Sequence, residues 1–311
     1  MKAMIFAAGF GTRLRPLTRL RPKALLPVGN RPVLDKVLHY LKQWGIREVI
    51  VNAHHHAEQM VRHVDAYESN DMDVQVRVER TILGTGGGLK NTEDFWDDEP
   101  FVVINGDVLT DIDLKKPCEA HATSRATATL VLHRCEPYNQ VLLDGNGRIV
   151  DIGTESQPER LAFTGIHILD PEVLRPIRAG VYSDIIDCYR RLMVSGVRIH
   201  GHVSSGHYWR DMGTFAGYVR ANREEAERIG VSRIMGEGCT VDPSVRFLDW
   251  AVVGAGCVLE RDAEIARSIL WENCRVKHGV KVFDRILTGV GDVDRELCGR
   301  TFHVPGGGGE D

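Results

Sequence analysis

The sequence predicts an α/β domain with a doubly wound, mostly parallel sheet, followed by a short β-helix built from hexapeptide repeats. The first observation is that short runs rich in Val and Ile alternate with segments of helical spacing over the first two-thirds of the 311 residues. The second is a period of six residues that replaces this alternation after about residue 230. Alternating strands and helices are typical of βαβ units, which place parallel strands side by side.

The α/β domain is expected to cover residues 1–229. Its predicted strands lie at residues 3–8, 48–52, 74–78, 101–104, 128–133, 140–143, 148–152, 164–169 and 198–202. Its predicted helices lie at residues 33–44, 57–67, 184–194 and 214–229. The strands are rich in β-branched residues, whereas the helical segments repeat their apolar residues every three or four positions.

A hexapeptide pattern begins at Met235. Steps of six from this residue reach nine positions, of which all but Lys277 are apolar: Met235, Val241, Phe247, Val253, Leu259, Ile265, Trp271, Lys277 and Phe283. Four residues after each of the first six stands a second, mostly small or aliphatic residue: Cys239, Val245, Ala251, Cys257, Ala263 and Ile269. This period predicts a β-helix over residues 230–303, and residues 304–311 are expected to form a disordered tail.

Composition and charge narrow the class of protein. The net charge is −4, from 39 basic and 43 acidic residues, whereas nucleic-acid binding proteins usually carry a basic excess. No apolar run approaches the length of a membrane span. The seven cysteines form no C-x-x-C pair, so we expect reduced core thiols. We therefore expect a cytoplasmic protein without nucleic-acid or membrane partners.

The loop after the first predicted strand is glycine-rich and basic. Between Phe10 and Leu34 it has six basic residues and no acidic residue. Glycines allow the backbone N–H groups to approach phosphate oxygens, and Arg offers a planar fork to a phosphate. The loop lacks the G-x-x-x-x-G-K-[ST] pattern of a P-loop, and Leu14 stands where a dinucleotide-binding fingerprint has glycine.

Sequence blocks in this loop and beyond resemble the nucleotide-sugar pyrophosphorylases. The first block reads AAGFGTRLRPLT from Ala7 and continues as PKALLPV from Pro22. Four further blocks follow in the family's order: Leu83–Gly88, Asn105–Asp107, Phe163–Ile166 and Trp209–Thr214. The resemblance implies a Rossmann-like nucleotidyltransferase domain similar to mannose-1-phosphate guanylyltransferases, together with the left-handed β-helix that many members carry.

The resemblance also implies a reaction and its machinery. In this family the sugar phosphate attacks the α-phosphorus of a nucleoside triphosphate (NTP), and pyrophosphate leaves without a covalent enzyme intermediate. Arg13 and Lys23 match the two basic residues that act on the phosphates. Asp107 and Asp211 are the expected carboxylates for Mg²⁺, which prefers one or two protein carboxylates plus phosphate oxygens. The expected partners are thus an NTP and a sugar-1-phosphate.

Further residues are assigned to the two substrates. The expected nucleotide-binding residues are Ala7, Ala8, Gly9, Gly11, Thr12, Glu79, Gly84, Thr85 and Gly86. Glu79 stands where thymidylyl-transferring relatives often have glutamine, and a carboxylate, which only accepts hydrogen bonds, favours the N–H donors of guanine. The expected sugar-binding residues are Asn105, Gly106, Thr164, Gly165 and Glu155. Glu155 here replaces a Glu-Lys-Pro motif that the sequence lacks, and mannose-, heptose- or muramyl-type sugars remain open.

Two other functions remain as alternatives. The first is a UTP-dependent uridylyltransferase that acts on an N-acetylated sugar-1-phosphate. The second is a regulatory relative that binds nucleotide without turnover, which predicts the loss of at least one of the four phosphate- and metal-binding side chains named above. All four are present. The exposed last coil of the β-helix would favour a homo-oligomer.

Overall fold

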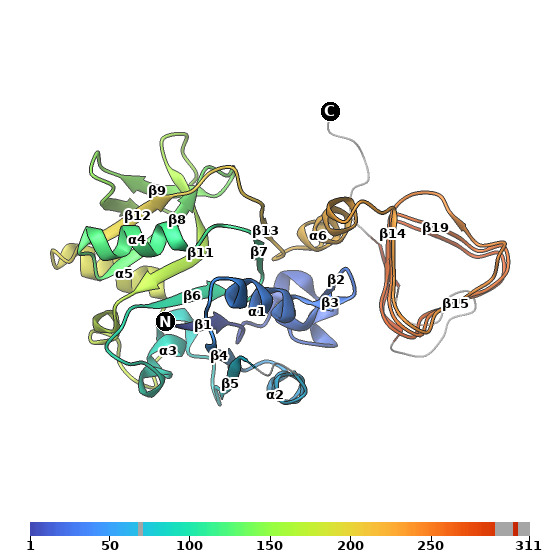
Figure 1. Cartoon of the computed structure of the whole chain (residues 1–311), viewed down its shortest axis with the longest axis horizontal. Coiled ribbons are helices and arrows are strands. Elements are labelled where there is room, and N and C mark those ends of the chain that lie inside the picture. The colour runs from blue at the N-terminus through green and yellow to red at the C-terminus, as the bar shows by residue number, and fades with distance from the viewer. Residues whose placement is uncertain (68–70, 290–300, 304–311) are drawn as a thin grey trace. The chain divides into compact units, whose positions relative to one another are not determined.

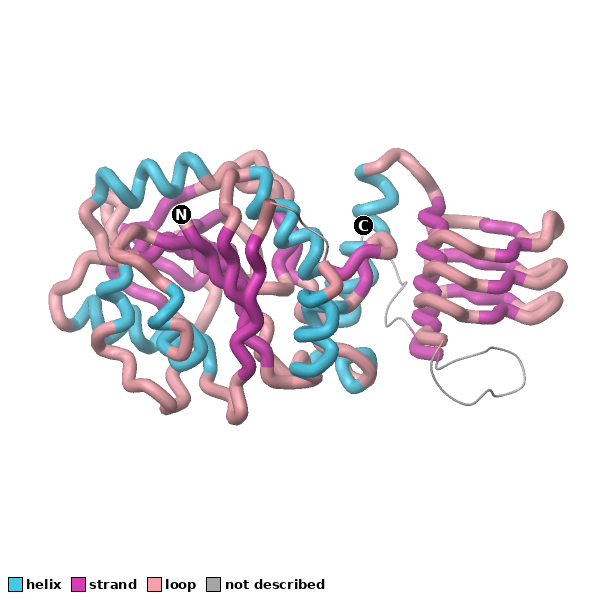
Figure 2. The backbone as a smooth tube through the Cα atoms, turned by 60° about the horizontal axis from the view of Figure 1, so that its bottom comes forward, coloured by secondary structure: helices cyan, strands magenta, loops and turns pink. Residues whose placement is uncertain are grey.

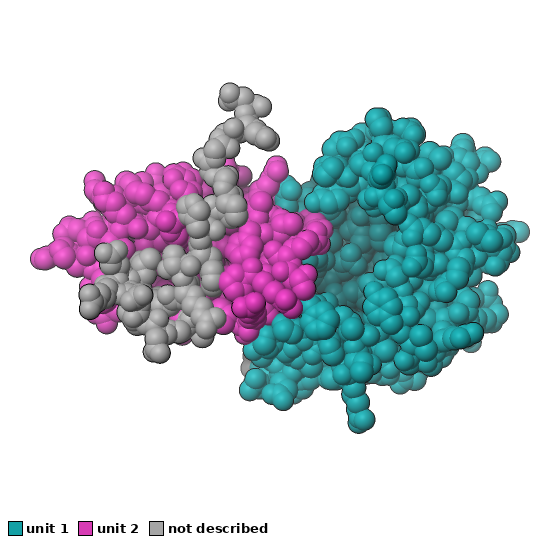
Figure 3. Space-filling model, turned by 180° about the vertical axis from the view of Figure 1, so that it is seen from behind, with its two compact units in different colours: residues 1–11, 21–24, 34–210 teal, residues 12–20, 25–33, 211–311 magenta. Residues whose placement is uncertain are grey.

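The computed structural model describes residues 1–67, 71–289 and the backbone of 301–303. These residues form two compact units (Figure 3): unit 1 comprises residues 1–11, 21–24 and 34–210, and unit 2 comprises residues 12–20, 25–33 and 211–311. The glycine-rich loop is therefore divided between the units. The predicted boundary at residue 229, which follows the sequence pattern, stays a prediction. The predicted tail at 304–311 lies outside the described residues.

The main sheet of unit 1 has nine strands: β1 (Lys2–Phe6), β4 (Glu48–Ala53), β5 (Asp73–Val78), β6 (Phe101–Asn105), β8 (Ala128–His133), β9 (Asn139–Leu143), β10 (Ile149–Ile152), β11 (Leu161–Leu169) and β12 (Ile199–Val203). Their order is β10-β9-β11-β6-β1-β4-β5, and β8 and β12 extend the sheet from β11. Strands β6, β1, β4 and β5 run parallel, as does the pair β8–β12. Strand β11 is antiparallel to β6, β8 and β9, so the predicted α/β fold is confirmed with a mixed sheet.

Among the described residues, five α-helices lie in unit 1, apart from the first residue of α1: α1 (Val33–Gln43), α2 (Ala57–Asp65), α3 (Gly84–Lys90), α4 (Lys115–Ser124) and α5 (Ile185–Val194). Helix α2 packs on β5, α3 on β1, α4 on β8, β11 and β12, and α5 on β10. Figure 2 shows helices on both sides of this sheet, as a doubly wound fold requires. A short sheet of β7 (Val108–Thr110) and β13 (Trp209–Asp211) follows the end of β6.

Helices α3 and α4 were not expected from the sequence. Four of the seven residues of α3 are glycine, and glycine lowers helix propensity by about 1 kcal/mol per residue. Pro117 lies at the third position of α4, inside the first turn, where its missing N–H leaves no helical hydrogen bond unmade. Tertiary contacts thus form both helices despite weak local signals.

The β-helix in unit 2 consists of three stacks of short parallel strands. The first stack is β14 (Arg233–Met235), β17 (Ala251–Val253), β20 (Ser268–Leu270) and β23 (Arg285–Leu287), with β24 (Thr301–His303) added antiparallel. The second is β15 (Thr240–Val241), β18 (Val258–Leu259) and β21 (Arg275–Val276), and the third is β16 (Arg246–Phe247), β19 (Glu264–Ala266) and β22 (Lys281–Phe283). Figure 1 looks along the stacks and shows a triangular cross-section. The predicted β-helix is confirmed.

The coil length explains where the predicted period of six fails. Arg233 pairs with Ala251 and Ala251 with Ser268, so equivalent positions are 18 and then 17 residues apart. The first coil carries its additional residue at the corner between β16 and β17. Leu259 therefore pairs with Val276 and not with Lys277, and Val276 is fully buried. Cys239, Cys257 and Cys274 occupy equivalent positions in three successive coils, a column that the sequence analysis did not detect.

Unit 2 also contains a helix and a hairpin. Helix α6 (Phe215–Arg228) lies against the hairpin of β2 (Pro27–Val28) and β3 (Arg31–Pro32). The Tyr218 hydroxyl donates to the Pro27 carbonyl oxygen at 2.8 Å and accepts from Trp271 Nε1 at 3.0 Å. Tyr218 and Trp271 are almost fully buried. A single side chain of α6 thus joins the hairpin to the β-helix.

His167 of β11 is a buried histidine in the core of unit 1. Its Nδ1 lies 2.7 Å from the Tyr189 hydroxyl, and the rings of Phe6 and Phe163 pack edge-on against it. Burial lowers the pKa of His167 from 6.5 to about 3. Between these two values only the unfolded chain takes up the proton, so this group lowers the stability of the fold as the pH falls below about 6.5.

We predict that His167 removes about 2 kcal/mol from the free energy of unfolding between pH 7 and pH 5. His167→Asn keeps an acceptor near the Tyr189 hydroxyl but cannot titrate, so its stability should fall less over this range. Urea denaturation of both proteins at pH 7 and pH 5 measures the difference. His278→Asn, at an exposed corner, is the matched control. Equal pH dependence of the wild type and His167→Asn would contradict the prediction.

Candidate active site

The first segment of the site is the loop that follows β1. Ala7 N–H donates to Asn52 Oδ1 at 2.7 Å, which fixes the start of the loop to the end of β4. Ala8 is buried, and Gly11 has a φ of +58°, which favours glycine. A Cβ at Gly9 would meet no protein atom within 4 Å, so the fold leaves space beside this backbone. Such space permits the close approach of a ligand to backbone N–H groups.

Lys23 and Asp107 form a direct ion pair in unit 1. Lys23 begins a short 3-10 helix (Lys23–Leu25), and Asp107 lies in the turn after β6. The two side chains are 16% and 22% exposed. Gly106 N–H donates to the Phe6 carbonyl oxygen at 2.9 Å, and a Cβ at Gly106 would lie 2.8 Å from that oxygen. The turn that carries Asp107 is therefore held against the end of β1.

The glycine-rich segment that begins α3 is held by backbone contacts. Gly84 has a φ of +72°, and a Cβ there would lie 2.6 Å from the Ser183 carbonyl oxygen. That oxygen accepts from the N–H groups of Gly86 at 2.8 Å and Gly87 at 3.1 Å. Thr85 Oγ1 accepts from Ile185 N–H at 2.9 Å, at the start of α5. The segment thus has little freedom to move relative to the chain before α5.

Glu79 lies between these segments, immediately after β5. It is 3% exposed, and both carboxylate oxygens accept hydrogen bonds from the protein. Oε1 accepts from Asn52 Nδ2 at 2.7 Å, and Oε2 accepts from Leu83 N–H at 3.0 Å. The predicted direct contact of Glu79 with a nucleobase stays a prediction.

The predicted sugar-binding residues divide into a group of four and one separate residue. Gly165, with a φ of +82°, lies against Asn105, because a Cβ there would be 2.6 Å from Asn105 Nδ2. The fully buried Thr164 donates its hydroxyl to the Val131 carbonyl oxygen at 2.8 Å, and Gly106 follows Asn105 directly. Glu155 is exposed between β10 and β11, and among the described contacts none joins it to this group.

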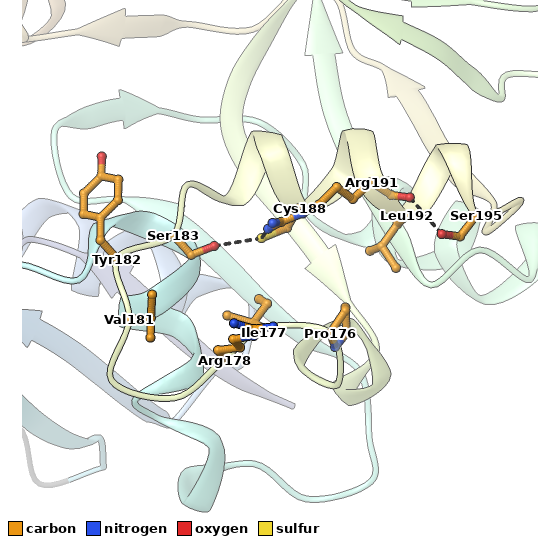
Figure 4. A pocket seen from close by; sticks show the side chains of 10 residues that line it. All are labelled: Pro176, Ile177, Arg178, Val181, Tyr182, Ser183, Cys188, Arg191, Leu192 and Ser195. Atoms are coloured by element: carbon orange, nitrogen blue, oxygen red, sulfur yellow. Dashed lines mark hydrogen bonds between the residues drawn. The ribbon is translucent and has the colours of Figure 1, made fainter.

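A cavity of about 620 Å³ opens beside the glycine-rich segment, and no sequence motif indicated it. It is lined by Pro176, Ile177, Arg178, Val181, Tyr182, Ser183, Cys188, Arg191, Leu192 and Ser195 (Figure 4). Ser183 Oγ and Cys188 Sγ lie 3.1 Å apart on its wall. The backbone of Ser183 also bonds to Leu83, Gly86 and Gly87, so one residue borders both the cavity and the glycine-rich segment.

Arg13 and Asp211 come together within unit 2. Arg13 lies in a 3-10 helix that includes Thr12 (Thr12–Leu14), and the Asp211 carboxylate accepts from Gly213 N–H. A Cβ at Gly213 would lie 2.7 Å from both Arg13 Nη2 and Asp211 Oδ1. A guanidinium and a carboxylate thus flank one backbone position, and glycine leaves them room.

A comparison with known protein families covers most of the chain. The model of the nucleotidyl transferase family matches residues 2–228, which is well over half of the chain. The chain belongs to the nucleotidyl transferase family. The match includes the β1 loop, the ion pair of unit 1 and the Arg13–Gly213 region of unit 2. The resemblance expected from the sequence blocks is confirmed.

Individual relatives of this nucleotidyl transferase span most of its length. A UTP–glucose-1-phosphate uridylyltransferase of Synechocystis is 28% identical over 95% of this chain and 89% of its own length. A mannose-1-phosphate guanylyltransferase of Mycobacterium tuberculosis is 28% identical over 89% of this chain and 81% of its own. The crystal structure of HddC from Yersinia pseudotuberculosis with GMP-PN has a TM-score of 0.62 and 21% identity, covering 72% of this chain and 99% of that one, and supports the fold.

Two observations bear on the predicted partners of the nucleotidyl transferase. Among the described residues, no helix is both long and apolar enough to cross a membrane. Within the same residues, no group of three or more His, Cys, Asp or Glu side chains could hold a metal ion on its own.

We predict that Gly213→Ala lowers the kcat of the transferase by about 10²-fold, because the added methyl group would displace Arg13 and Asp211. Gly213 does not adopt a positive φ, so the substitution should leave the backbone unstrained. Gly9→Ala, where a Cβ meets no protein atom, is expected to keep the melting temperature and serves as the control for folding. Turnover and thermal unfolding of both variants test this, and unchanged kcat in Gly213→Ala would contradict it.

Proposed function

We propose that this nucleotidyl transferase transfers a nucleoside monophosphate from an NTP to a sugar-1-phosphate, giving a nucleotide sugar and pyrophosphate. The preferred pair is GTP with a mannose- or heptose-type sugar-1-phosphate. The ion pair of Lys23 and Asp107 carries the proposal, because it sets a cation and a carboxylate beside the loop after β1. Family membership and the names of the similar transferases support the same reaction.

The proposed chemistry is a direct displacement at phosphorus. A phosphate oxygen of the sugar-1-phosphate forms a bond to the α-phosphorus, and the bond from that phosphorus to the bridging oxygen of pyrophosphate breaks. Lys23 contacts the α-phosphate and the sugar phosphate, and Arg13 contacts the triphosphate and stabilises the leaving pyrophosphate. Positioning and neutralisation of charge are sufficient for such a step, so no nucleophilic side chain is needed.

Magnesium is proposed as the metal of this reaction. The Asp107 carboxylate fits it, because it is a hard oxygen ligand at a strand end whose present contact is the cation Lys23. Asp211 is proposed as the second carboxylate. When bound, Mg²⁺ would supply positive charge at the α-phosphate and the leaving oxygens. Lys23 would then exchange Asp107 for a phosphate oxygen as the substrates enter.

We propose that the substrate pocket has a nucleotide-facing part and a sugar-facing part. The backbone from Ala7 to Thr12 and from Gly84 to Gly86 faces the nucleotide. Asn105, Gly106, Thr164 and Gly165 face the sugar, and Glu155 would join them only if its segment moves. Similarity to the guanylyltransferase of Mycobacterium tuberculosis supports GTP as the substrate of this chain. Similarity to the uridylyltransferase of Synechocystis supports UTP as the second candidate.

The cellular context is part of the same proposal. Six cysteines within the described residues are free thiols, which fits a reducing, cytoplasmic compartment. The acidic net charge of −4 fits small phosphorylated substrates better than nucleic acid as partners. The β-helix is proposed as the surface through which copies of the chain would associate.

The first test is pyrophosphate release in the presence of Mg²⁺. GTP, UTP, dTTP, ATP and CTP are each combined with a panel of sugar-1-phosphates. The strongest signal is expected for GTP with a mannose- or heptose-type phosphate. A dominant UTP signal with an N-acetylated sugar would support the second candidate. No release from any pair would refute the proposed reaction and favour a regulatory protein.

A second test removes the carboxylate of the ion pair. Asp107→Asn should lower kcat by about 10²- to 10³-fold, because the metal loses its charged ligand. Glu119→Gln is the matched control: it makes the same chemical change on the exposed surface of α4 and should keep full activity. Circular dichroism should report both variants as folded. A near-normal rate in Asp107→Asn would be incompatible with the proposed metal site.

A further inference from the structure

Two buried side chains connect the nucleotide-facing segments of unit 1. Asn52 near the end of β4 accepts from Ala7 N–H through Oδ1 and donates to Glu79 Oε1 through Nδ2, both at 2.7 Å. Glu79 Oε2 then accepts from Leu83 N–H at 3.0 Å. Asn52 and Glu79 are each 3% exposed. The four groups therefore form one continuous chain of hydrogen bonds from the β1 loop to the start of α3.

The direction of these hydrogen bonds fixes both residue types. The backbone N–H groups at the two ends, on Ala7 and Leu83, can only donate. When the side-chain oxygen of Asn52 accepts from Ala7 N–H, its amide nitrogen necessarily points towards Glu79. Glu79 must then accept from two donors, and a carboxylate, which only accepts, does this with both oxygens. Asparagine followed by glutamate is thus one complete solution for this chain.

The surroundings leave the pair little room to rearrange. A Cβ at Gly88 would lie 2.7 Å from both Asn52 Nδ2 and Glu79 Oε1, so only glycine allows α3 to approach so closely. His54 adds a second connection, because its Nδ1 lies 2.9 Å from the Glu79 carbonyl oxygen and its ring packs edge-on against Phe10 of the β1 loop. Because both side chains are almost fully buried, an unpaired polar atom in this place would be costly.

We propose that Asn52 and Glu79 are a positioning pair that sets the geometry of the nucleotide site by joining the β1 loop to the start of α3. The inference rests on the proposed function for its kinetic consequences. On this proposal the carboxylate of Glu79 is needed to accept hydrogen bonds from Asn52 and Leu83, and not from the N–H groups of guanine. The preference among nucleobases must then arise from other residues.

An exchange of the two functional groups tests the proposal. In Glu79→Gln, either the Leu83 N–H or the Asn52 amide loses its acceptor. In Asn52→Asp, two buried carboxylates face each other. In the double variant Asn52→Asp/Glu79→Gln, the new aspartate accepts from Ala7 and from the glutamine amide, and the glutamine oxygen accepts from Leu83. The double variant restores every hydrogen bond, but the bond between residues 52 and 79 now runs from residue 79 as donor to residue 52 as acceptor.

We expect each single variant to lose about tenfold or more in kcat/KM for the NTP, because one buried partner is unsatisfied. The double variant should recover to within about threefold of the wild type, with an unchanged ratio of GTP to UTP turnover. Glu58→Gln, the same chemical change at an exposed position of α2, is the matched control and should behave as the wild type. All proteins are compared at a temperature where circular dichroism reports them folded.

Two outcomes would overturn the proposal. If Glu79 reads the base directly, the double variant stays as impaired as Glu79→Gln and its preference shifts towards UTP. If the pair serves only stability, the single variants melt at lower temperature but keep their kcat/KM. Amide hydrogen exchange at Leu83 gives a readout that needs no turnover: it should be faster in Glu79→Gln, where Leu83 N–H and the Asn52 amide compete for one oxygen, and slow again in the double variant. An inactive wild type refutes the proposed function, whereas unrestored exchange protection refutes the pair.

Discussion

The position of β1 at the centre of the parallel strands is the constraint on which the site depends. Both neighbours of β1 are parallel to it, so the carboxyl ends of β1, β4 and β6 lie at the same edge of the sheet. Ala7, Asn52 and Asp107 each lie at or just beyond one of these ends. The middle residues of these strands, such as Met4, Ile50 and Val103, are buried, so the register of the strands, and with it the relative placement of these three residues, is set by packing of the core.

Close backbone contacts at glycine residues hold together the loops that follow these strand ends. Gly84, Gly88, Gly106 and Gly165 each approach a carbonyl oxygen or a side chain so closely that a methyl group would not fit. Glycine at these positions shortens the distances between neighbouring loops, and hydrogen bonds then hold the loops together. The site is consequently built from backbone geometry and a few buried polar side chains, with Lys23 and Asp107 as its mostly buried charged pair.

The sequence predicted the fold well where periodicity was strong and less well where contacts between distant segments decide the structure. The strands of the main sheet and the hexapeptide coils follow from their apolar patterns. Helix α3 was missed because its glycines carry no helical signal, and the antiparallel direction of β11 has no local signature. Asp107 was proposed as a site residue because it stands in a motif. Asn52, which also lies near the end of a parallel strand, has no motif, and its two hydrogen-bond partners are 45 and 27 residues away.

The additional residue at the corner of the first β-helix coil has a practical consequence for modifying this protein. The strands before and after the corner keep their pairing with the next coil, although one coil is 18 residues long and the next is 17. The additional residue is accommodated at the corner, and the pairing of the strands on either side is unchanged. Leu248 at this corner is 55% exposed. A fluorophore, an affinity tag or a surface attachment introduced at this corner would leave the stacked strands of the β-helix intact.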